Sequence, residues 1–486
     1  MSYQVPEHID PNKVFLVNHS ALEERLDPQY YEEHFDFHNF VKLSSIAKVS
    51  GGKRIPLGKD YSLEPTEFLY LRVADIQDEG IVDYNQFKCI DKDVFETLKR
   101  YEIYNGNLAI SIAGTVGKVV IIKGIPNDKH VILTENCAKI TIINNDILAE
   151  YFYLMLSMPI VQRQIELNYI QTTIPKLGLD RVNGLMLPQP PSIASQQEII
   201  RIYNVACSQK LKKEQQADSL LQSIDEYLLS ELGIQLPETK SQTIQDRMFV
   251  VNFSEVSGGR LDSKLYSNEI KQLKQSLFTS SYEKQPLNYF IKSSCNGEWG
   301  KDETEEVDES KNTKCLVIRA TEFDNTYNLR LDNSRVKYRW VDNSKLSRMD
   351  ILPNDLLIEK SGGSEDQPVG RVSMITEEIL QSHQIAYSNF IHKITVDGIN
   401  PKYLYFYLKT MHNIGITDSM QSQTNGIRNL IMKEYFDQTI IVPSLQKQQE
   451  IVDHLSSIRQ QAKALQEEGK AILEQAKKEV EHMILG

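Results

Sequence analysis

The stretch PPSIASQQEIIRIYN at residues 190–204 returns near the C-terminus as VPSLQKQQEIVDHLS at residues 442–456. Pro191 and Pro443 lie 252 residues apart, which is far longer than a solenoid repeat and is the size of a whole module. In both places a Pro-Ser pair precedes a long segment with apolar residues at helical spacing. The repeat therefore predicts a chain of two related halves, each ending in a long helix.

Shorter matches extend the duplication upstream. Phe68–Ala74 corresponds to Cys315–Thr321, and Tyr151–Leu154 corresponds to Tyr403–Phe406. The spacing is 247 residues for the first pair and 252 for the second, so insertions separate the matched segments. We infer that each half contains a globular module of the same fold.

Each module is predicted to begin with strands and to end with a helix. Short, β-branched runs bounded by turn residues predict strands at Phe68–Val73, Leu108–Ile112, Val119–Ile122, Leu316–Ile318, Leu356–Ile358 and Ile391–Val396. Aromatic-rich segments with good helix formers predict helices at Ala149–Leu156 and Pro401–Leu408.

The two long helices carry coiled-coil patterns. The last helix has an a/d seam with steps of three and four residues: Ile451, Leu455, Ile458, Ala462, Leu465, Gly469, Ile472, Ala476, Glu479 and Met483. The earlier helix has a looser seam, interrupted by Lys210 and Lys213: Ile199, Ile202, Ala206, Ala217, Leu220, Ile224 and Tyr227. We expect the two helices to pair antiparallel; the alternative is that each packs only on its own module.

Composition excludes several classes of protein. With 41% hydrophobic and 25% charged residues, the chain has the make-up of a soluble globular protein, and no apolar run approaches the roughly 20 residues of a membrane span. The first residues lack a secretion signal, so we expect a cytoplasmic location. The five scattered cysteines form no C-x-x-C pair, which argues against disulfides and against a zinc site.

The formal net charge of −12 lowers the expectation of nucleic-acid binding, because Lys and Arg contacts to phosphates supply most non-specific affinity. A summed charge hides its distribution, however. Acidic runs such as Glu303–Asp308 can face away while basic residues line one groove. The charge therefore weakens the hypothesis of DNA binding without excluding it.

No catalytic motif stands out. The chain has no P-loop, dinucleotide fingerprint, H-E-x-x-H, G-x-S-x-G or N-P-P-[YF] run. Asp302, Glu309 and Lys311 resemble the acidic and lysine pattern of metal-dependent nucleases, but no strand is predicted around them, which favours a solvated loop. We therefore expect neither a catalytic site nor a metal site.

Two glycine-containing loops follow predicted strands at equivalent places. The first is Ser111–Lys118, and the second runs from Ser361 to Arg371. Glycine lets backbone N–H groups approach an oxygen, and Ser, Thr, Lys and Arg hold phosphates, so these loops are candidates for DNA contact. The alternative is a tight turn between strands.

Together these segments carry a family resemblance. The run KLSSIAKVSGGKRIPLGKDYS at Lys42–Ser62, the FLYLRVADI strand, the S-x-x-G-T-V-G-K loop, the Gln171-Thr172 turn and the P-P-S-I-x-x-Q-Q-E-I helix entry resemble the specificity subunit of type I restriction-modification systems. The second half keeps the same frame, with E-K-S-G-G, P-V-G-R-V and V-P-S-L-x-x-Q-Q-E-I.

The resemblance implies a non-catalytic subunit of a methyltransferase and endonuclease complex. Each of two target-recognition domains would recognise one half of a split, asymmetric site in double-stranded DNA, and the helices would set the spacer. The implied partners are two methyltransferase subunits and restriction subunits. S-adenosylmethionine, ATP and magnesium are implied only for those partners, and no cofactor is expected in this chain.

The expected fold class is α+β, with two similar mixed α/β target-recognition domains separated by long helices paired as an antiparallel coiled coil. The repeated triplets Arg25–Asp27 and Arg260–Asp262 mark a prelude to each domain. The predicted boundaries are an N-terminal prelude at 1–35, the first target-recognition domain at 36–190, the central helix at 191–232, a linker with the second prelude at 233–285, the second target-recognition domain at 286–442 and the C-terminal helix at 443–486.

The residues expected to contact DNA are basic, amide or hydroxyl side chains suited to phosphates and base edges. In the first domain they are Lys53, Arg54, Arg72, Thr115, Lys118, Gln171, Thr172 and Lys176. In the second domain they are Arg319, Lys360, Ser361, Arg371, Gln423, Thr424 and Arg428. Arg72 and Arg319 fall within predicted strands, where their alternative role is structural.

Two rival functions stay open on the sequence alone. The first is a duplicated protein-binding adaptor or scaffold without DNA binding, which the acidic balance favours slightly. The second is a nuclease or methyltransferase in its own right, for which Asp302, Glu309 and Lys311 would have to form a metal site.

Overall fold

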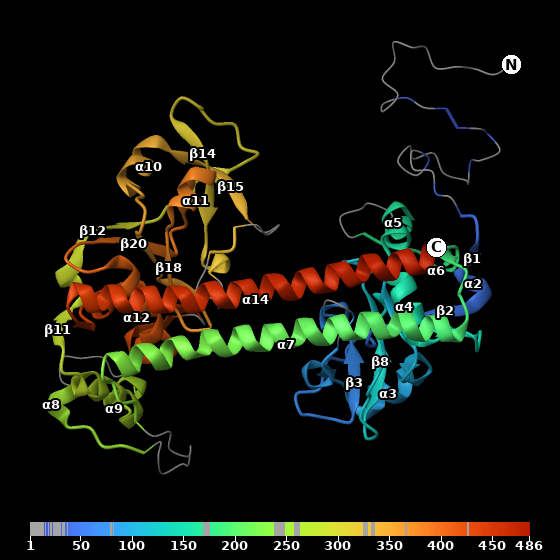
Figure 1. Ribbon diagram of the computed structural model, residues 1–486. Helices are drawn as coiled ribbons and strands as arrows, with labels where there is room; N and C mark the ends of the chain where they lie inside the picture. Colours follow the sequence, from blue (N-terminus) through green and yellow to red (C-terminus); the bar gives the residue numbers. More distant parts are fainter. Residues whose placement is uncertain are drawn as a thin grey trace. The chain divides into compact units, whose positions relative to one another are not determined.

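The computed structural model folds into two compact units (Figure 1). Unit 1 comprises residues 1–211 with 469–486, and unit 2 comprises residues 212–468. The structure describes residues 37–486 except 78–79, 81, 169–174, 238–247, 257–262, 324–328, 332–335, 365–366 and 425–426, together with residues 14, 16, 17, 19, 22, 31 and 35. Both prelude triplets lie outside the described residues.

Within its described residues, unit 1 contains two four-stranded sheets and a two-stranded one. The first sheet has the order β2 (Ala47–Gly51), β9 (Cys137–Ile142), β6 (Leu108–Ser111) and β7 (Val119–Ile121). The second has the order β4 (Lys88–Cys89), β3 (Phe68–Leu71), β8 (His130–Leu133) and β5 (Glu102–Ile103), with β3 and β8 parallel. The short pair is β1 (Phe40–Lys42) with β10 (Met186–Pro188).

Unit 2 repeats this plan. Its first sheet has the order β12 (Ile291–Asn296), β20 (Ile391–Val396), β16 (Leu356–Glu359) and β18 (Val372–Met374). Its second has the order β13 (Lys301–Asp302), β15 (Lys337–Asp342), β14 (Asn312–Ile318) and β19 (Ile385–Tyr387), with β14 and β19 parallel. The short pair is β11 (Glu283–Pro286) with β23 (Thr439–Val442), and a further sheet joins β17 (Ser361–Gly363), β22 (Ile427–Leu430) and β21 (Gln421–Thr424).

Unit 1 has α2 (Leu43–Ile46), α3 (Lys92–Leu98), α4 (Ala149–Ser157), α5 (Pro159–Asn168) and α6 (Leu179–Asn183). Unit 2 has α8 (Phe253–Val256), α9 (Asn268–Ser276), α10 (Asn343–Met349), α11 (Glu377–Ser382), α12 (Pro401–Asn413) and α13 (Met432–Phe436). The long helices are α7 (Ile193–Glu231) and α14 (Leu445–Leu485). Helices α4 and α12 and the two long helices lie where the sequence predicts them, and the shorter helices were not predicted. Among the described residues, none of these helices combines the length and apolar character needed to cross a bilayer.

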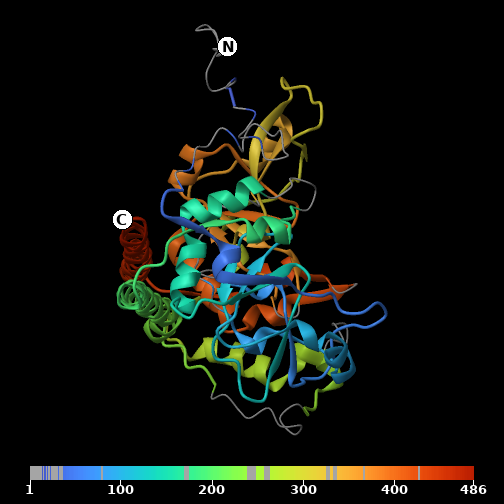
Figure 2. The same ribbon diagram turned by 90° about the vertical axis from the view of Figure 1, so that its right-hand side faces the viewer.

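The long helices pair antiparallel within each unit, as the sequence predicts. In unit 1, Ile199 near the start of α7 and Val480 near the end of α14 belong to one buried cluster with the residues of α4. In unit 2, Leu228 near the end of α7 and Leu455 near the start of α14 belong to a second cluster around α12. Figure 2 shows α7 and α14 side by side. The alternative in which each helix packs only on its own module is wrong, since both helices contribute to both clusters.

The predicted a/d seam of α14 is wrong in its last two turns. Glu479 and Met483 are exposed, while their neighbours Val480 and Ile484 are buried. A straight helix drifts relative to a strict heptad, and this end of α14 must also cover α4. The buried face therefore shifts by one residue after Ala476, which is itself buried at its predicted position.

The repeated Gln-Gln pair has a structural explanation. Gln196 is fully buried, and its side-chain oxygen accepts a hydrogen bond of 2.9 Å from the backbone N–H of Leu148, at the start of α4. Gln448 makes the same 2.9 Å bond to the N–H of Asn400, at the start of α12. Both amide groups also donate to the carbonyl of the proline that precedes their helix. The motif thus ties each long helix to the helix of its own module.

Candidate nucleic-acid interface

The two modules share a backbone arrangement, called the frame below, in which one glycine (Gly52 or Gly297) packs directly against the backbone of another segment. Gly52 donates its N–H to Cys137 O at 3.0 Å, and Gly297 donates to Ile391 O at 3.2 Å. A Cβ on Gly52 would lie 2.0 Å from the Thr134 carbonyl oxygen, and one on Gly297 would lie 2.1 Å from the Ser388 carbonyl oxygen. No side chain fits at either position. Sequence reasoning missed this pair because the residues around the two glycines differ.

The predicted arginines of the matched strands are held in place by carboxylates. Arg72 pairs with Asp75 across the 3₁₀ turn Val73–Asp75, and its guanidinium Nη2 lies 2.5 Å from Asp75 Oδ1. Arg319 pairs with Glu322 in the same way at 2.7 Å. In both turns the carboxylate also accepts the arginine's own backbone N–H. The prediction that these arginines fall within strands is wrong, since β3 ends at Leu71 and β14 at Ile318; each arginine instead closes the 3₁₀ turn that follows its strand.

The basic residue that ends each glycine loop reaches the same turn. Lys118 donates to the carbonyl of Ile76 at 3.2 Å, and Arg371 donates to the carbonyl of Phe323 at 3.1 Å. Arg371 also pairs with Glu359 at 2.7 Å, where burial raises the pKa of the Glu359 carboxyl and the Arg371 hydrogen bond opposes that rise. Both cations brace the loop against the 3₁₀ turn.

The glycine loops need left-handed backbone. Gly117 and Gly370, each directly before the basic residue, have φ of 92° and 102°. Thr115 lies exposed at the tip of the first loop, where its carbonyl accepts a 2.5 Å hydrogen bond from the Ser111 hydroxyl. Such a tip presents backbone and hydroxyl groups to solvent.

A solvated cation lies beside the first glycine of the frame. The Arg54 side chain is 80% exposed and its Nε lies 2.6 Å from Glu135 Oε1. Burial opposes ionisation of Glu135, but the hydrogen bond and charge of Arg54, together with hydrogen bonds from the Glu135 backbone and Thr134, lower the pKa of that carboxyl. Tyr70 donates to the Lys53 carbonyl at 2.8 Å and fixes the loop. Lys53 and Arg54 are thus exposed cations on a fixed backbone.

In unit 2 the second glycine loop joins a hairpin. β17 pairs with β22, so that Ser361 lies opposite Asn429 and Gly363 opposite Arg428. β22 pairs in turn with β21, which places Gln423 opposite Arg428 and Thr424 opposite Ile427. The structure thereby brings four predicted residues, Ser361, Gln423, Thr424 and Arg428, into one small sheet.

The corresponding part of unit 1 is described in part. Lys176 is exposed and forms an isolated bridge with Ala113 of the first glycine loop. Gln171 and Thr172 lie outside the described residues. Lys176 therefore lies beside the first loop as Arg428 lies beside the second.

A polar network in unit 2 contains two residues that sequence reasoning missed. Lys360 Nζ lies 2.7 Å from Asn296 Oδ1, and His392 Nδ1 lies 2.9 Å from the same oxygen. Burial lowers the pKa of Lys360, and burial together with the Lys360 charge lowers the pKa of His392 to about 4. Only Lys360 was among the predicted residues, because a contact between β12, β20 and the residue that follows β16 leaves no local sequence signal.

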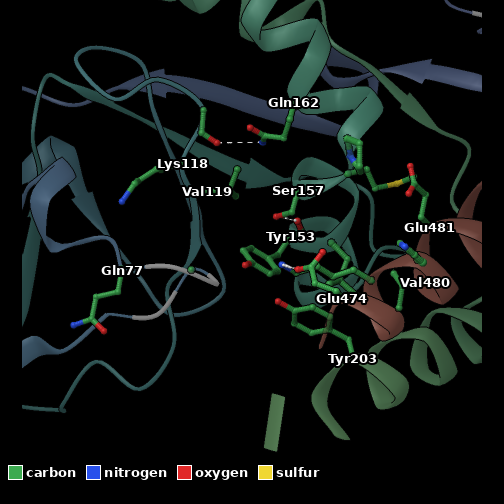
Figure 3. Close-up of a pocket in the computed structure, with 17 residues that line it drawn as sticks. Gln77, Lys118, Val119, Tyr153, Ser157, Gln162, Tyr203, Glu474, Val480 and Glu481 are labelled. Carbon is green, nitrogen blue, oxygen red and sulfur yellow. Dashed lines mark hydrogen bonds and ion pairs between the residues drawn. The ribbon is translucent and has the colours of Figure 1, made fainter. Parts of the chain in front are cut away.

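A cavity of about 690 Å³ lies in unit 1 between the first glycine loop, α4 and the end of α14 (Figure 3). Gln162 crosses its rim, donating to the Gly117 carbonyl at 3.1 Å. Its walls mix lysines with carboxylates, among them Lys118, Glu474 and Glu481. The mixed charge gives this cavity no preference for a phosphate backbone.

The nuclease-like triplet is not assembled. Asp302 belongs to strand β13, so the prediction that no strand surrounds these residues is wrong. Asp302 pairs with Arg339 at 3.1 Å, and Lys311 pairs with Asp308 at 3.4 Å. Across the part of the chain that the structure describes, no group of His, Cys, Asp and Glu residues is arranged to hold a metal ion.

Comparisons with known proteins find one curated relative and several solved structures that resemble this chain. The Escherichia coli type I restriction enzyme EcoBI specificity subunit is 28% identical over 131 residues, a match spanning 27% of this chain and 27% of that relative. The structure of a type I restriction-modification S subunit from M. genitalium covers 92% of this chain and 94% of its own at 14% identity and a TM-score of 0.38. The HsdS subunit from Thermoanaerobacter tengcongensis covers 92% and 95% at 13% identity and a TM-score of 0.34.

The sequence model of one family matches both halves. That family is described as the type I restriction modification DNA specificity domain, and the matched segments are residues 37–218 and 296–475. Each segment contains one glycine of the frame, the 3₁₀ turn closed by an arginine and a carboxylate, a glycine loop and a Gln-Gln helix entry. The chain therefore belongs to the type I restriction-modification DNA specificity domain family.

Proposed function

We propose that this chain is the DNA sequence-specificity subunit of a type I restriction-modification complex. The observation that carries the proposal is the double occurrence of one backbone frame with different side chains on it, each copy matched by the family. The target-recognition domains are residues 36–190 and 286–442. Each recognises one half of a bipartite site, and because their exposed side chains differ, the site is asymmetric.

The paired helices set the spacer between the half-sites. Support comes from the length of α7 and α14, 39 and 41 residues, and from their buried apolar faces. Ion pairs reinforce the pairing in unit 2, with Lys213 Nζ 2.6 Å from Glu468 Oε2 and Lys447 Nζ 2.5 Å from Glu231 Oε2. A helix pair fixed by an apolar seam and by ion pairs has a defined length.

The chain acts without catalysis of its own, within a cytoplasmic complex. Two methyltransferase subunits and restriction subunits supply the chemistry, and S-adenosylmethionine, ATP and magnesium belong to them. The family assignment and the mutual pairing of Asp302 and Arg339, which leaves the nuclease-like triplet dispersed, support this division of labour.

The residues that we propose to contact DNA are the same as those predicted from the sequence. Those that the structure describes fall into two groups, according to their exposure and their hydrogen-bond partners. Side chains with exposed or loop positions are suited to direct contact: Lys53, Arg54, Thr115, Lys176, Lys360, Ser361 and Arg428. Side chains engaged with their own turn are suited to holding the loops: Arg72, Lys118, Arg319 and Arg371. Gln171, Thr172, Gln423 and Thr424 are proposed from the repeat alone.

A domain exchange tests the proposal. Residues 42–186 are replaced by the equivalent domain of a family member with a different known target, and the methylated positions are sequenced in cells carrying the methyltransferase subunits. One half of the recognised sequence should change, while the other half and the spacer stay the same. A change in both halves would contradict the modular recognition.

The adaptor hypothesis predicts a different result in a binding experiment. Titrating the assembled complex with duplex DNA at increasing salt should show affinity that falls steeply, since released counterions drive phosphate contact. An adaptor without DNA binding would show neither specific affinity nor a salt slope.

A further inference from the structure

Asn296, at the end of strand β12 in unit 2, has an amide group whose orientation is fixed by two neighbours. Lys360 Nζ and His392 Nδ1 lie 2.7 Å and 2.9 Å from its Oδ1 atom. An ammonium group has only donors, so the atom that faces Lys360 must be the amide oxygen and not the nitrogen. The Asn296 amide is therefore locked with its oxygen turned inward.

The same contacts assign the tautomer of His392. Because His392 shares the Asn296 oxygen with Lys360, its Nδ1 must carry a proton and donate it. The neighbouring Lys360 charge and burial keep the imidazole neutral, so Nε2 carries no proton. Nε2 is buried beside the Phe436 ring and has no hydrogen-bond partner among the residues that the structure describes. A buried acceptor without a partner costs free energy, and we attribute its retention to the role of the imidazole in positioning Asn296.

The lock limits what Asn296 can recognise. A carbonyl oxygen accepts two hydrogen bonds, and both are taken. An asparagine pairs with adenine by donating to N7 and accepting from the N6 amino group, which here is blocked. Asn296 is exposed and offers its amide nitrogen, which is a donor only. The ammonium of Lys360 lies next to it as a second donor.

Among the bases, guanine alone presents two adjacent acceptors, O6 and N7, in the major groove. Adenine and cytosine present an amino donor, and thymine presents a methyl group beside its single acceptor. Two fixed donors side by side therefore match guanine and discriminate against the others. The positive charge on one donor strengthens the contact further.

The surroundings suit a close approach of DNA. Lys360 directly precedes Ser361 and Gly362 of the glycine loop, and its N–H donates to the carbonyl of Phe390, a ring that is 47% exposed. Gly362 has a φ of 102° and lies exposed beside that ring. In unit 1 the three network positions correspond to Gly51, Ile112 and Ala138, so the network belongs to the second half alone.

We propose that unit 2 recognises a guanine in its half-site through Asn296 and Lys360, with His392 as the positioning residue. This inference rests on the proposed function, since it names one base that the DNA-binding surface selects. It also predicts that an adenine replaces guanine as an accepted base when the Asn296 oxygen is released from Lys360.

The test is a selection of binding sequences from a library randomised in both half-sites, using the assembled complex of the full chain with its methyltransferase subunits. Wild type should select a guanine at one position of the second half-site. Asn296→Asp keeps both acceptor contacts but removes the donor, and the preference for guanine should fall about 5- to 150-fold, from the roughly 1–3 kcal/mol of such a pair. Lys360→Met should admit adenine at the same position.

Asn268→Asp, an identical charge change at an exposed residue of α9, is the matched control and should leave the selected sequence unchanged. A second measurement does not depend on any variant folding: replacing the selected guanine by 7-deazaguanine, which lacks the N7 acceptor, should weaken wild-type binding at least 5-fold.

Three outcomes would overturn the inference while leaving the proposed function standing: a specific site without a guanine in the second half, an unchanged preference in Asn296→Asp, or a loss of affinity equal for all sequences, which indicates a phosphate contact. If wild type selects no sequence at all, the proposed function itself fails.

Discussion

The two modules share a backbone and differ in the side chains that the backbone presents. Gly52 and Gly297 make equivalent contacts with the backbone that leads into β9 and β20, respectively. The 3₁₀ turns after β3 and β14 are both closed by an arginine and a carboxylate. The residue directly before the frame glycine, however, is Gly51 in unit 1 and Asn296 in unit 2. The comparison teaches that the two modules keep a glycine where two backbone segments touch, whereas the side chain one residue before that glycine differs between them.

A second difference lies two residues after the frame glycine. In unit 1 this position is Arg54, which extends into solvent and pairs with Glu135. In unit 2 it is Trp299, and the cation comes instead from Arg339, whose guanidinium lies 4.6 Å from the centre of the indole ring. At this position unit 1 has a solvated cation, Arg54, whereas unit 2 has a cation stacked on an aromatic ring, Arg339. The two differ in hydration and in how far they extend from the backbone.

The largest expected effect comes from breaking the shared frame. Gly52→Ala and Gly297→Ala each place a Cβ about 2 Å from a carbonyl oxygen of the backbone. Each variant should lower the free energy of unfolding of its own unit by at least about 4 kcal/mol, with a similar loss in both. Hydrogen exchange on the full chain, followed peptide by peptide, measures the two units separately.

Gly58→Ala is the control for the frame glycines. Gly58 has a φ of 83° but open space around the added methyl, so only backbone strain remains, about 1 kcal/mol. Comparable losses in Gly52→Ala and Gly58→Ala would show that the close approach does not define the frame.

The next largest effect concerns the helix entries. Gln196→Leu leaves the N–H of Leu148 and the carbonyls of Asp146 and Pro191 without this partner, and should cost about 2–3 kcal/mol in unit 1. Gln448→Leu should have a similar effect in unit 2. Thermal unfolding with local exchange checks this. The neighbour Gln197 is exposed, so Gln197→Leu should change little; an equal loss there would contradict the assignment.

The third prediction separates the units by pH. His392 has a pKa lowered to about 4, whereas in the unfolded chain it titrates near 6.5, so the unfolded state binds more protons in between. Stability from the neutral imidazole is therefore complete above about pH 6.5 and is lost as the pH falls toward 4. By pH 5 unit 2 should have lost about 2 kcal/mol, with Lys360 the charged group that opposes protonation.

Ala138 occupies the equivalent position of unit 1, which should lack this loss. Local exchange measured from pH 7 to pH 5 compares the units in one sample. His392→Gln should remove most of the difference between them, and an unchanged pH dependence in that variant would assign the titration to other groups.

The smallest effect on stability comes from Arg54. Arg54→Met removes an exposed ion pair and should leave the unfolding midpoint unchanged. If Arg54 contacts a phosphate, DNA affinity should fall evenly across sequences and the slope of log affinity against log salt should decrease by about one. A change confined to one base of the first half-site would instead make Arg54 a base contact.

The sequence was informative wherever a pattern is local. Strands such as β6 and β20, helix α12 and both long helices lie where periodicity placed them, because burial of one face imposes a fixed spacing. The end of the α14 seam was not predictable, since the choice between Glu479 and Val480 depends on the extra contact with α4.

The site was predictable in part for the same reason. Lys360 and Arg371 stand in a recognisable loop, and their residue types alone suggested phosphate or base contact. That Arg371 is bound by Glu359 while Lys360 orients Asn296 follows from pairing between strands far apart in the sequence. The frame glycines were missed because close packing of backbone leaves only a glycine as its signature.

Unit 1 is assembled from two separate parts of the chain, and this has a consequence during synthesis. Residues 469–486 supply Leu473, Ala476, Val480 and Ile484 to a buried cluster whose other buried members precede residue 212. A ribosome releases those last residues after the whole of unit 2 has been made. The apolar side of α7 beside α4 therefore stays exposed to water until residues 469–486 of α14 have been translated. The first module to be synthesised is thus the last to be completed.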